Sequence, residues 1–466
     1  MKIVILWTDA VVLLVFVATL IYVAKVRRTP HMAATWRKAF RRPTGMAAAT
    51  VLAVFVSVGI VDSFHYRPLL APGAGGERVY APETVSVLDG ILARQRNGGE
   101  RSYSAPLAYQ GYEKEAVTTN GTTVRVYPRL THAGTHLADP PRDWLGDVLV
   151  RGVLGAVGGL LAVVVAAALG LVAIARRVQQ SPRCVWEVLI TGRAPYPARS
   201  VLLTLLVLGA LGGIGASLAA GYHVFGTDRV GNDLLYLVAK SIRTALVIGT
   251  LSTLVTMPIA VGLGILAGYL RGWVDEAIQY VYTVINSIPY VLLIAASVLI
   301  LMVFIDNHSD LFPTAADRTD ARLFFLCVIL GLTSWTDLCR LIRGEVIKLR
   351  ETEYIQAAQA FGVSTARIVL VHLLPNVMHL ILISMVINFS GLVLAEAVLS
   401  YVGIGVDPSM QSFGTLINTA RLELSRQPAI WWTLTAAFSF MFTLVLSANL
   451  FSDAIRDAFD PRANHH

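Results

Sequence analysis

The chain has 466 residues, of which 55% are hydrophobic and only 15% are charged, a composition that excludes an ordinary soluble globular protein. It indicates a polytopic membrane protein. The formal net charge of +8 does not indicate a nucleic-acid partner, because excess Lys and Arg in a membrane protein mark its cytoplasmic loops.

Nine apolar runs are long enough to cross a bilayer, and their continuous apolar character predicts helices instead of a barrel. Three of these runs precede residue 199 and six follow it. We therefore expect an all-α polytopic fold. The runs cover about residues 3–23, 46–64, 148–175, 200–221, 242–269, 278–305, 323–342, 377–399 and 430–451.

The charges of the loops predict how the chain crosses the membrane. The linker that follows the first run is basic and has no acidic residue, as expected of a cytoplasmic loop. Acidic residues gather after the sixth run, so that loop is expected outside. Alternation then places the N-terminus outside and the C-terminus in the cytoplasm. Because its positive charges follow the apolar residues, the first run is predicted to be a retained anchor and not a cleaved signal peptide.

A polar segment, residues 65–147, separates the second and third runs and is predicted to be extracytoplasmic. Thr122–Tyr127 has a strand pattern and follows the turn signal Asn120-Gly121. The segment is therefore either a small β-containing domain or an irregular loop. His132 and His136 have helical metal-ligand spacing, but a third ligand is not evident, so no metal site is expected.

The loop before the fifth run carries two glycines and several polar residues, which suit a tight turn. Asp233 at its end is suited to cap the next helix. We consider this loop a candidate extracytoplasmic entrance site. Its candidate residues are His223, Gly226, Thr227, Asp228, Gly231 and Asp233.

Polar residues inside apolar runs are candidates for a transport pathway. Glu396 is ionisable, and such residues usually face a bundle interior or a water-filled path. A hydrogen bond to a neighbouring helix explains Glu396 equally well, and for each asparagine alone it is the favoured explanation. The pathway candidates are Asn286, Asn388 and Glu396.

A soluble stretch, about residues 343–376, interrupts the apolar runs and predicts a helix-turn-helix at the membrane surface. Its small side chains allow a partner to approach closely, and Gly362 suits a left-handed turn. The stretch therefore has the character of a docking element. Its candidate residues are Glu353, Gln356, Ala357, Ala358, Gly362, Leu374, Pro375 and Asn376.

The two alanines, the glycine four residues later and the following Leu-Pro pair resemble the coupling-loop motif of ABC importer permeases. The entrance loop is similar to the corresponding signature of the oligopeptide/dipeptide type, as are residues 394–405 and 453–462. The chain departs from the family at Asn232, usually Arg, at Gln356, usually Glu, and at Thr283, usually Asp. The resemblance covers about residues 200–462.

This resemblance implies a six-helix type I permease core, residues 200–466, in a bacterial inner membrane. It further implies a second related permease, two ATPase subunits and an extracytoplasmic substrate-binding protein. Peptides are the expected cargo, with nickel chelates, oligosaccharides and peptide-like antibiotics left open. The chain has no phosphate-binding Gly-Lys-Ser/Thr loop. We therefore expect it not to be an enzyme and to bind no cofactor, with ATP and Mg used by the partner ATPases.

The N-terminal residues have no counterpart in a six-span permease, and we divide them into 1–64, 65–147 and 148–199. Two functions of other classes compete with an importer permease. An ion-coupled secondary transporter would use Glu396 as a proton site, but it leaves the coupling loop unexplained. A noncatalytic membrane scaffold would need neither Glu396 nor the His223 loop.

Overall fold

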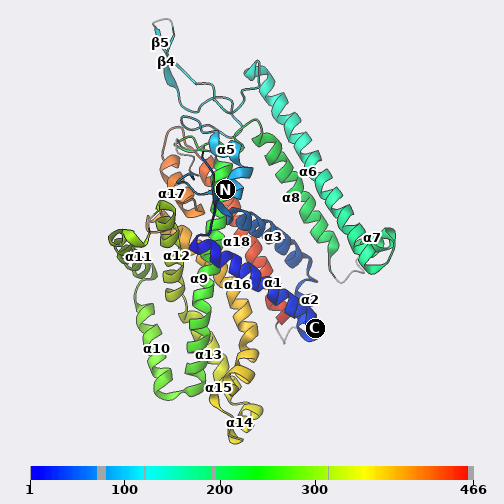
Figure 1. The fold of residues 1–466 in the computed structure, drawn as a ribbon, viewed down its shortest axis with the longest axis vertical. Coiled ribbons are helices and arrows are strands. Elements are labelled where there is room, and N and C mark those ends of the chain that lie inside the picture. The colour runs from blue at the N-terminus through cyan, green and yellow to red at the C-terminus, as the bar shows by residue number, and fades with distance from the viewer. Residues whose placement is uncertain (1, 71–79, 120–121, 192–195, 313, 460–466) are drawn as a thin grey trace. The chain divides into compact units, whose positions relative to one another are not determined.

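The computed structural model describes residues 2–70, 80–119, 122–191, 196–312 and 314–459 (Figure 1). By its contacts the chain forms two compact units, and three of the five division points fall within helices. The first unit comprises Met1–Val4, Trp36–Thr244 and Gln411–Phe451, and the second comprises Ile5–Thr35, Ala245–Met410 and Ser452–His466. The first unit thus combines the polar segment 65–147 with residues 200–244 of the predicted permease core.

Long helices carry most of the first unit. Several begin at proline, which is suited to the first helical position because its missing N–H has no intrahelical partner there. The helices that lie wholly or largely in this unit are α3 (Pro43–Asp62), α6 (Pro140–Val178), α7 (Pro182–Ile190), α8 (Ala198–Ala219), α17 (Phe413–Leu424) and α18 (Trp432–Phe459), and α2 (Pro30–Ala39) is divided between the two units.

Helices α6 and α8 lie side by side and pack at glycines (Figure 1). Gly155 and Gly159 on α6 face Gly209 and Gly213 on α8, and a Cβ added at Gly159 would overlap the carbonyl oxygen of Gly209. Small residues four apart let two helix backbones approach closely in a membrane. The third N-terminal helix and the first helix of the predicted permease core therefore form one closely packed pair.

The polar segment contains the β structure that the sequence left open. Strands β1 (Lys2–Val4), β2 (His65–Arg67) and β3 (Val85–Ser86) form an antiparallel sheet, followed by the short helices α4 (Val87–Ile91) and α5 (Ala93–Asn97). Strands β4 (Glu115–Thr119) and β5 (Thr122–Val126) pair antiparallel, which confirms the strand predicted at residues 122–127. The turn predicted at 120–121 lies outside the described residues.

The second unit contains α1 (Trp7–Arg28), most of α9 (Leu234–Leu270) and a series of helices that follow it. Two apolar cores stabilise this unit; one surrounds Ile342 and Val346, and the other surrounds Ile294 and Leu330. The remaining elements are α10 (Gly272–Ser287), α11 (Tyr290–Asn307), η1 (Ser309–Leu311), α12 (Ala315–Thr333), α13 (Thr336–Arg350), α14 (Glu353–Ala360), α15 (Thr365–Arg367), the π-helix η2 (Ile368–Leu373) and α16 (Leu374–Tyr401).

Within the described ranges, eight helices are long and apolar enough to span a membrane, and α12 with α13 gives a ninth if the bent pair crosses as one. Nine is the number that the sequence predicts. Three predicted runs need correction. Residues 2–4 are a strand and not the start of the first helix, because they pair with β2.

The predicted continuous helices at 278–305 and 323–342 are both broken. Pro289 lacks an N–H and forces Ile288 into an extended conformation (φ −89°, ψ 131°), so α10 ends before it. In the other run the chain bends by 40° between α12 and α13. There the Ser334 hydroxyl donates to the Leu330 carbonyl at 2.7 Å, a bond that bends helices.

Candidate functional site

The predicted docking element forms the expected helix-turn-helix. Helix α14 ends at Ala360, and Gly362 adopts φ +72°, the left-handed conformation that ends a helix. The amide of Val363 donates to the Ala358 carbonyl at 3.0 Å, which closes the turn. The chain then re-enters helix at Thr365 and continues through the π-helix η2 into α16. A turn thus separates α14 from the next apolar helix.

One face of α14 is fixed to the core of the second unit and the other is exposed. Ile355 is fully buried, and Ala358 packs against the same apolar core. Ala357 is exposed, and the Phe361 side chain is 88% exposed at the tip of the turn. Both side chains therefore leave apolar surface in solvent at this end of α14. The sequence did not single out Phe361, although a large aromatic residue before the turn glycine was a visible signal.

The other residues of the docking element have ordinary structural contacts. Asn376 Nδ2 donates to Tyr354 Oη at 3.2 Å, which joins the start of α16 to α14. Gln356 Nε2 donates to the Glu351 carbonyl at 3.2 Å. Glu353 is exposed in the first turn of α14. Leu374 packs against the core and Pro375 lies in the first turn of α16.

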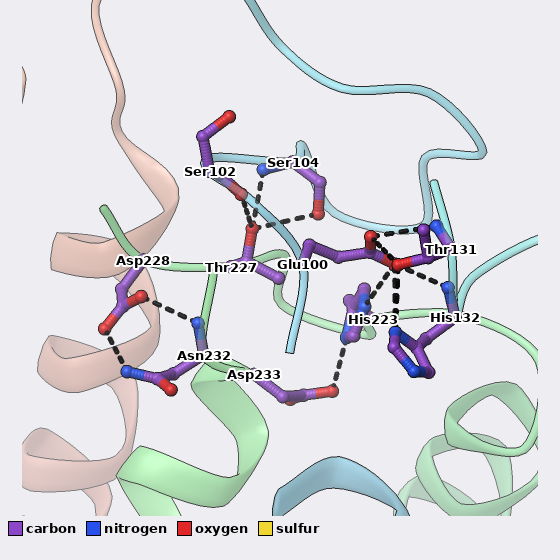
Figure 2. A network of polar contacts seen from close by, with 10 residues as sticks. All are labelled: Glu100, Ser102, Ser104, Thr131, His132, His223, Thr227, Asp228, Asn232 and Asp233. Carbon is purple, nitrogen blue, oxygen red and sulfur yellow. Dashed lines mark hydrogen bonds and ion pairs between the residues drawn. The ribbon is translucent and has the colours of Figure 1, made fainter. Parts of the chain in front are cut away.

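The entrance loop centres on a buried histidine between two carboxylates, as Figure 2 shows. His223 Nδ1 lies 2.7 Å from Asp233 Oδ2, and His223 Nε2 lies 3.5 Å from Glu100 Oε1. The three side chains are at most 5% exposed. Asp233 also accepts from the Leu235 amide at 2.8 Å through its other oxygen, which confirms the predicted cap of α9.

Glu100 comes from the polar segment and was not predicted as a site residue. Besides its contact with His223, the Glu100 carboxylate accepts hydrogen bonds from the amide and hydroxyl of Thr131 at 2.9 and 2.6 Å and from the amide of His132 at 2.7 Å (Figure 2). Nothing in its local sequence distinguishes it from other glutamates of the segment. Only the fold brings residues 100 and 223 together.

The ionisation of this group follows from its contacts. Burial alone would raise the pKa of Glu100, but hydrogen bonds from His223, Thr131 and His132 lower it to about 2. Burial alone would lower the pKa of His223, but hydrogen bonds to Asp233 and Glu100 raise it to about 9. At neutral pH the group is therefore an imidazolium held between two carboxylates, with both ring nitrogens donating.

Thr227 adds further hydrogen bonds between the entrance loop and the polar segment 65–147. Its hydroxyl donates to the Ser102 carbonyl at 2.9 Å and accepts from the Ser104 amide at 2.7 Å (Figure 2). The indole of Trp432 donates to the Thr227 carbonyl at 3.0 Å. Thr227 is fully buried by these contacts.

The two glycines of the loop take left-handed conformations, φ +78° at Gly226 and +86° at Gly231. The Gly231 carbonyl accepts from the Glu100 amide at 2.9 Å, and a Cβ at Gly231 would overlap the Glu100 backbone. Asp228 accepts from the amide and the side chain of Asn232 at 2.8 and 3.0 Å. Asn232, where the resemblance leads one to expect Arg, therefore closes the loop locally.

The three pathway candidates occupy different environments. Glu396 on α16 is 2% exposed and accepts from Ser400 Oγ at 2.6 Å on its own helix. Asn388 is half-buried on the same helix. Asn286 lies at the end of α10, where Thr336 Oγ1 donates to its Oδ1 at 3.1 Å. The structure does not bring these three side chains together into one site.

The two histidines considered as metal ligands have protein partners. His136 Nε2 lies 2.7 Å from Asp147 Oδ2, and His132 Nδ1 lies 3.0 Å from Thr131 Oγ1. Among the residues that the structure describes, no group of three His, Cys, Asp or Glu side chains has the arrangement of a metal site.

Comparison with known proteins identifies the family. Residues 260–465 match the model of the binding-protein-dependent transport system inner membrane component. Over 239 residues the chain is 31% identical to the oligopeptide transport system permease protein OppC of Mycobacterium tuberculosis, covering 51% of this chain and 76% of that protein. The chain belongs to this permease family.

Other permeases give the same result. The OppC protein of Escherichia coli is 31% identical over 240 residues, 52% of this chain and 72% of that protein. The dipeptide transport system permease protein DppC of Lactococcus lactis is 31% identical over 242 residues, 52% of this chain and 64% of that protein. The chain is thus a multi-pass membrane permease of a binding-protein-dependent ABC importer, and its matched half contains α14 and Gly362.

Proposed function

We propose that this permease forms half of the translocation pathway of an ATP-driven peptide importer and couples to separate ATPase subunits through α14. The observation that carries the proposal is the exposed face of α14, Ala357 and Phe361, followed by the left-handed Gly362 turn. A short helix of this kind suits a groove on a partner protein. The peptide cargo is inferred from the oligopeptide and dipeptide permeases to which the chain is similar.

In this mechanism the ATPases move α14 when they close around ATP. Ile355 and Ala358 connect α14 to the apolar core that contains Ile342 and Val346 of α13. A displacement of α14 is therefore transmitted to a membrane helix through packed side chains. It biases the helices between inward-open and outward-open states because one state binds the closed ATPases better.

The remaining partners follow from the same proposal. A second related permease completes the pathway, and an extracytoplasmic binding protein delivers the cargo to the side of the His223 network. The N-terminus then lies outside and the C-terminus in the cytoplasm. Affinity purification from the native membrane in mild detergent, followed by mass spectrometry, tests the assembly. Recovery of two ATPases, a second permease and a loaded binding protein is expected, whereas an intact chain without any ATPase would refute it.

The coupling role is tested at Gly362. Leucine there adds bulk at the docking turn and strains a left-handed backbone, so Gly362→Leu is expected to hydrolyse ATP without transport. Asn tolerates this conformation, so Gly362→Asn separates strain from bulk and should retain partial coupling. Gly344→Leu on α13 is the matched control, since Gly344 has open space and no positive φ. Normal uptake by a stably expressed Gly362→Leu importer would contradict the coupling role.

A further inference from the structure

Two broken helices meet within the second unit. The break between α10 and α11 spans Ile288 and Pro289, and the break between α12 and α13 spans Ser334 and Trp335. Two hydrogen bonds connect them. Thr336 Oγ1 donates to Asn286 Oδ1 at 3.1 Å, and the hydroxyls of Tyr290 and Ser334 lie 3.5 Å apart. The two breaks are therefore neighbours held by polar side chains.

A cavity of about 410 Å³ opens at these breaks. This volume lies within the range of small-molecule sites. About half of the lining is polar, and Ile285, Ile288 and Pro289 belong to its apolar part, even though both helix pairs are predicted to cross a membrane. The lining includes Asn286, Ser287, Tyr290, Leu293, Thr333 and Asp337.

On the span predicted at residues 278–305, the cavity lies part-way along the crossing. Asp275, near the start of α10, forms an ion pair with Arg343 at 2.6 Å. The helical rise of 1.5 Å per residue places Asn286 roughly 16 Å from Asp275 along α10. That distance is about half of the ~30 Å thickness of a bilayer core. On the predicted span 278–305, the polar lining is therefore expected within the membrane, where polar groups must face water, cargo or protein and not lipid.

Asp337 is the ionisable group of the cavity. Its side chain is exposed, and within the described ranges it has no hydrogen bond or ion pair. Carboxylates within a membrane usually face a bundle interior or a water-filled path. The last turns of α10 and α12 also end at the cavity, and the carbonyl groups of a last helical turn carry partial negative charge. Broken helices supply ion and substrate sites in this way in transporters.

Building on the proposed function, we infer that this cavity is a cargo subsite that binds a primary ammonium group, such as the free amino terminus of a peptide, with Asp337 as its counter-ion. The Asn286 and Tyr290 side chains supply neighbouring hydrogen-bonding groups. The site holds the cargo briefly during passage, because its exposed polar lining also admits water. An N-acetylated peptide lacks the charge and is bound less well.

Cysteine labelling tests the subsite without requiring transport. Ser287→Cys in a Cys184→Ser background places a reactive thiol at the cavity, since the other two cysteines are buried. In the purified complex, the water-soluble reagent MTSET is expected to modify Cys at 287. Tri-alanine should slow this reaction at least fivefold. Acetyl-tri-alanine, which lacks the ammonium group, should slow it less than twofold. Adding Asp337→Asn should abolish the protection by tri-alanine.

Several results would overturn the inference. Absence of labelling would show that the cavity is not water-filled, and equal protection by both peptides would remove the role of the ammonium group. Protection that survives Asp337→Asn would remove the role of Asp337. Loss of the second permease from the purified Asp337→Asn complex would assign the carboxylate to an ion pair between subunits.

Transport in proteoliposomes separates this inference from the proposed function. With saturating loaded binding protein, Asp337→Asn should lower tri-alanine uptake at least tenfold while ATP hydrolysis stays within twofold of wild type. Glu345→Gln on the same helix, whose partner is Lys348, is the matched control and should transport normally. If wild type itself shows no ATP-dependent uptake, the proposed function fails, and the labelling result still decides the subsite. Wild-type uptake equalled by Asp337→Asn would refute the subsite alone.

Discussion

The most direct test of the entrance network is the substitution Glu100→Gln. It preserves the shape of the side chain but removes the negative charge that faces His223 and accepts hydrogen bonds from Thr131 and His132. Glutamine has one oxygen in place of two, so one group of donors must face its NH₂ group. We expect the polar segment and the entrance loop to separate more easily in this variant.

The magnitude follows from the pKa of Glu100. Its folded value of about 2 lies below the ordinary 4.5, so the charged form stabilises the fold above pH 4.5, and this contribution is lost as pH falls through 2. At neutral pH the contribution is complete and amounts to about 3 kcal/mol, from about 1.4 kcal/mol per pKa unit. Removing one partner of a buried charged group costs a similar amount, about 3–5 kcal/mol.

Thermal unfolding of the detergent-purified protein at pH 7 measures this effect. A loss of about 3 kcal/mol should lower Tm by roughly 3 °C, because the entropy of unfolding grows with chain length, and hydrogen exchange should rise within residues 222–234. Glu113→Gln is the control, because the half-exposed Glu113–Arg426 pair is worth at most about 1 kcal/mol. Equal unfolding temperatures and exchange for the two variants would refute the role assigned to Glu100.

Three further outcomes are expected. Gly159→Leu should disrupt the α6–α8 pair and lower the yield of folded protein, whereas Gly158→Leu, which points into open space, should not; similar yields would contradict the close packing. Because the pKa of His223 is raised to about 9, the protonated imidazole stabilises the fold fully below pH 6.5, and this contribution is lost as pH rises through 9. Tm should therefore fall between pH 7 and 10, and a His223→Gln variant should lack this fall. Lys240→Met removes the cation that pairs with the buried carboxylates of Asp62 and Asp89, and it should lower Tm by several degrees more than the control Lys348→Met at an exposed position. An equal effect of the two substitutions would argue against a stabilising role for the Lys240 ion pairs.

Local sequence patterns were sufficient where one element determines the outcome. The apolar runs predicted the membrane spans, and the residues up to Gly362 predicted the helix α14 and the turn that follows it. Asp233 gave the cap of α9 because a cap depends on neighbouring residues alone. The helix breaks were harder to predict. Pro289 was a visible signal inside an apolar run, but Ser334 acts only through its hydrogen bond to Leu330.

Contacts between distant residues were not accessible in this way. Glu100 meets His223 only after the polar segment has folded onto the loop, and the sequence contains no local signal of that pairing. The same is true of Lys240, which pairs with Asp62 at 2.7 Å and Asp89 at 3.1 Å. Asp62 lies near the end of the predicted run 46–64, where it is buried and held by this ion pair. Residues of the N-terminal part of the chain, before residue 200, thus contact the entrance loop and the start of α9 directly.

The energy source of transport tests the central proposal most directly. The purified assembly, reconstituted in proteoliposomes with loaded binding protein, is expected to take up tri-alanine only when ATP and Mg are present on the side of α14. A proton gradient alone should produce no uptake, and Glu396→Gln should not change the dependence on ATP. Uptake driven by a proton gradient without ATPase subunits, and lost in Glu396→Gln, would contradict the account and assign the chain to ion-coupled transport.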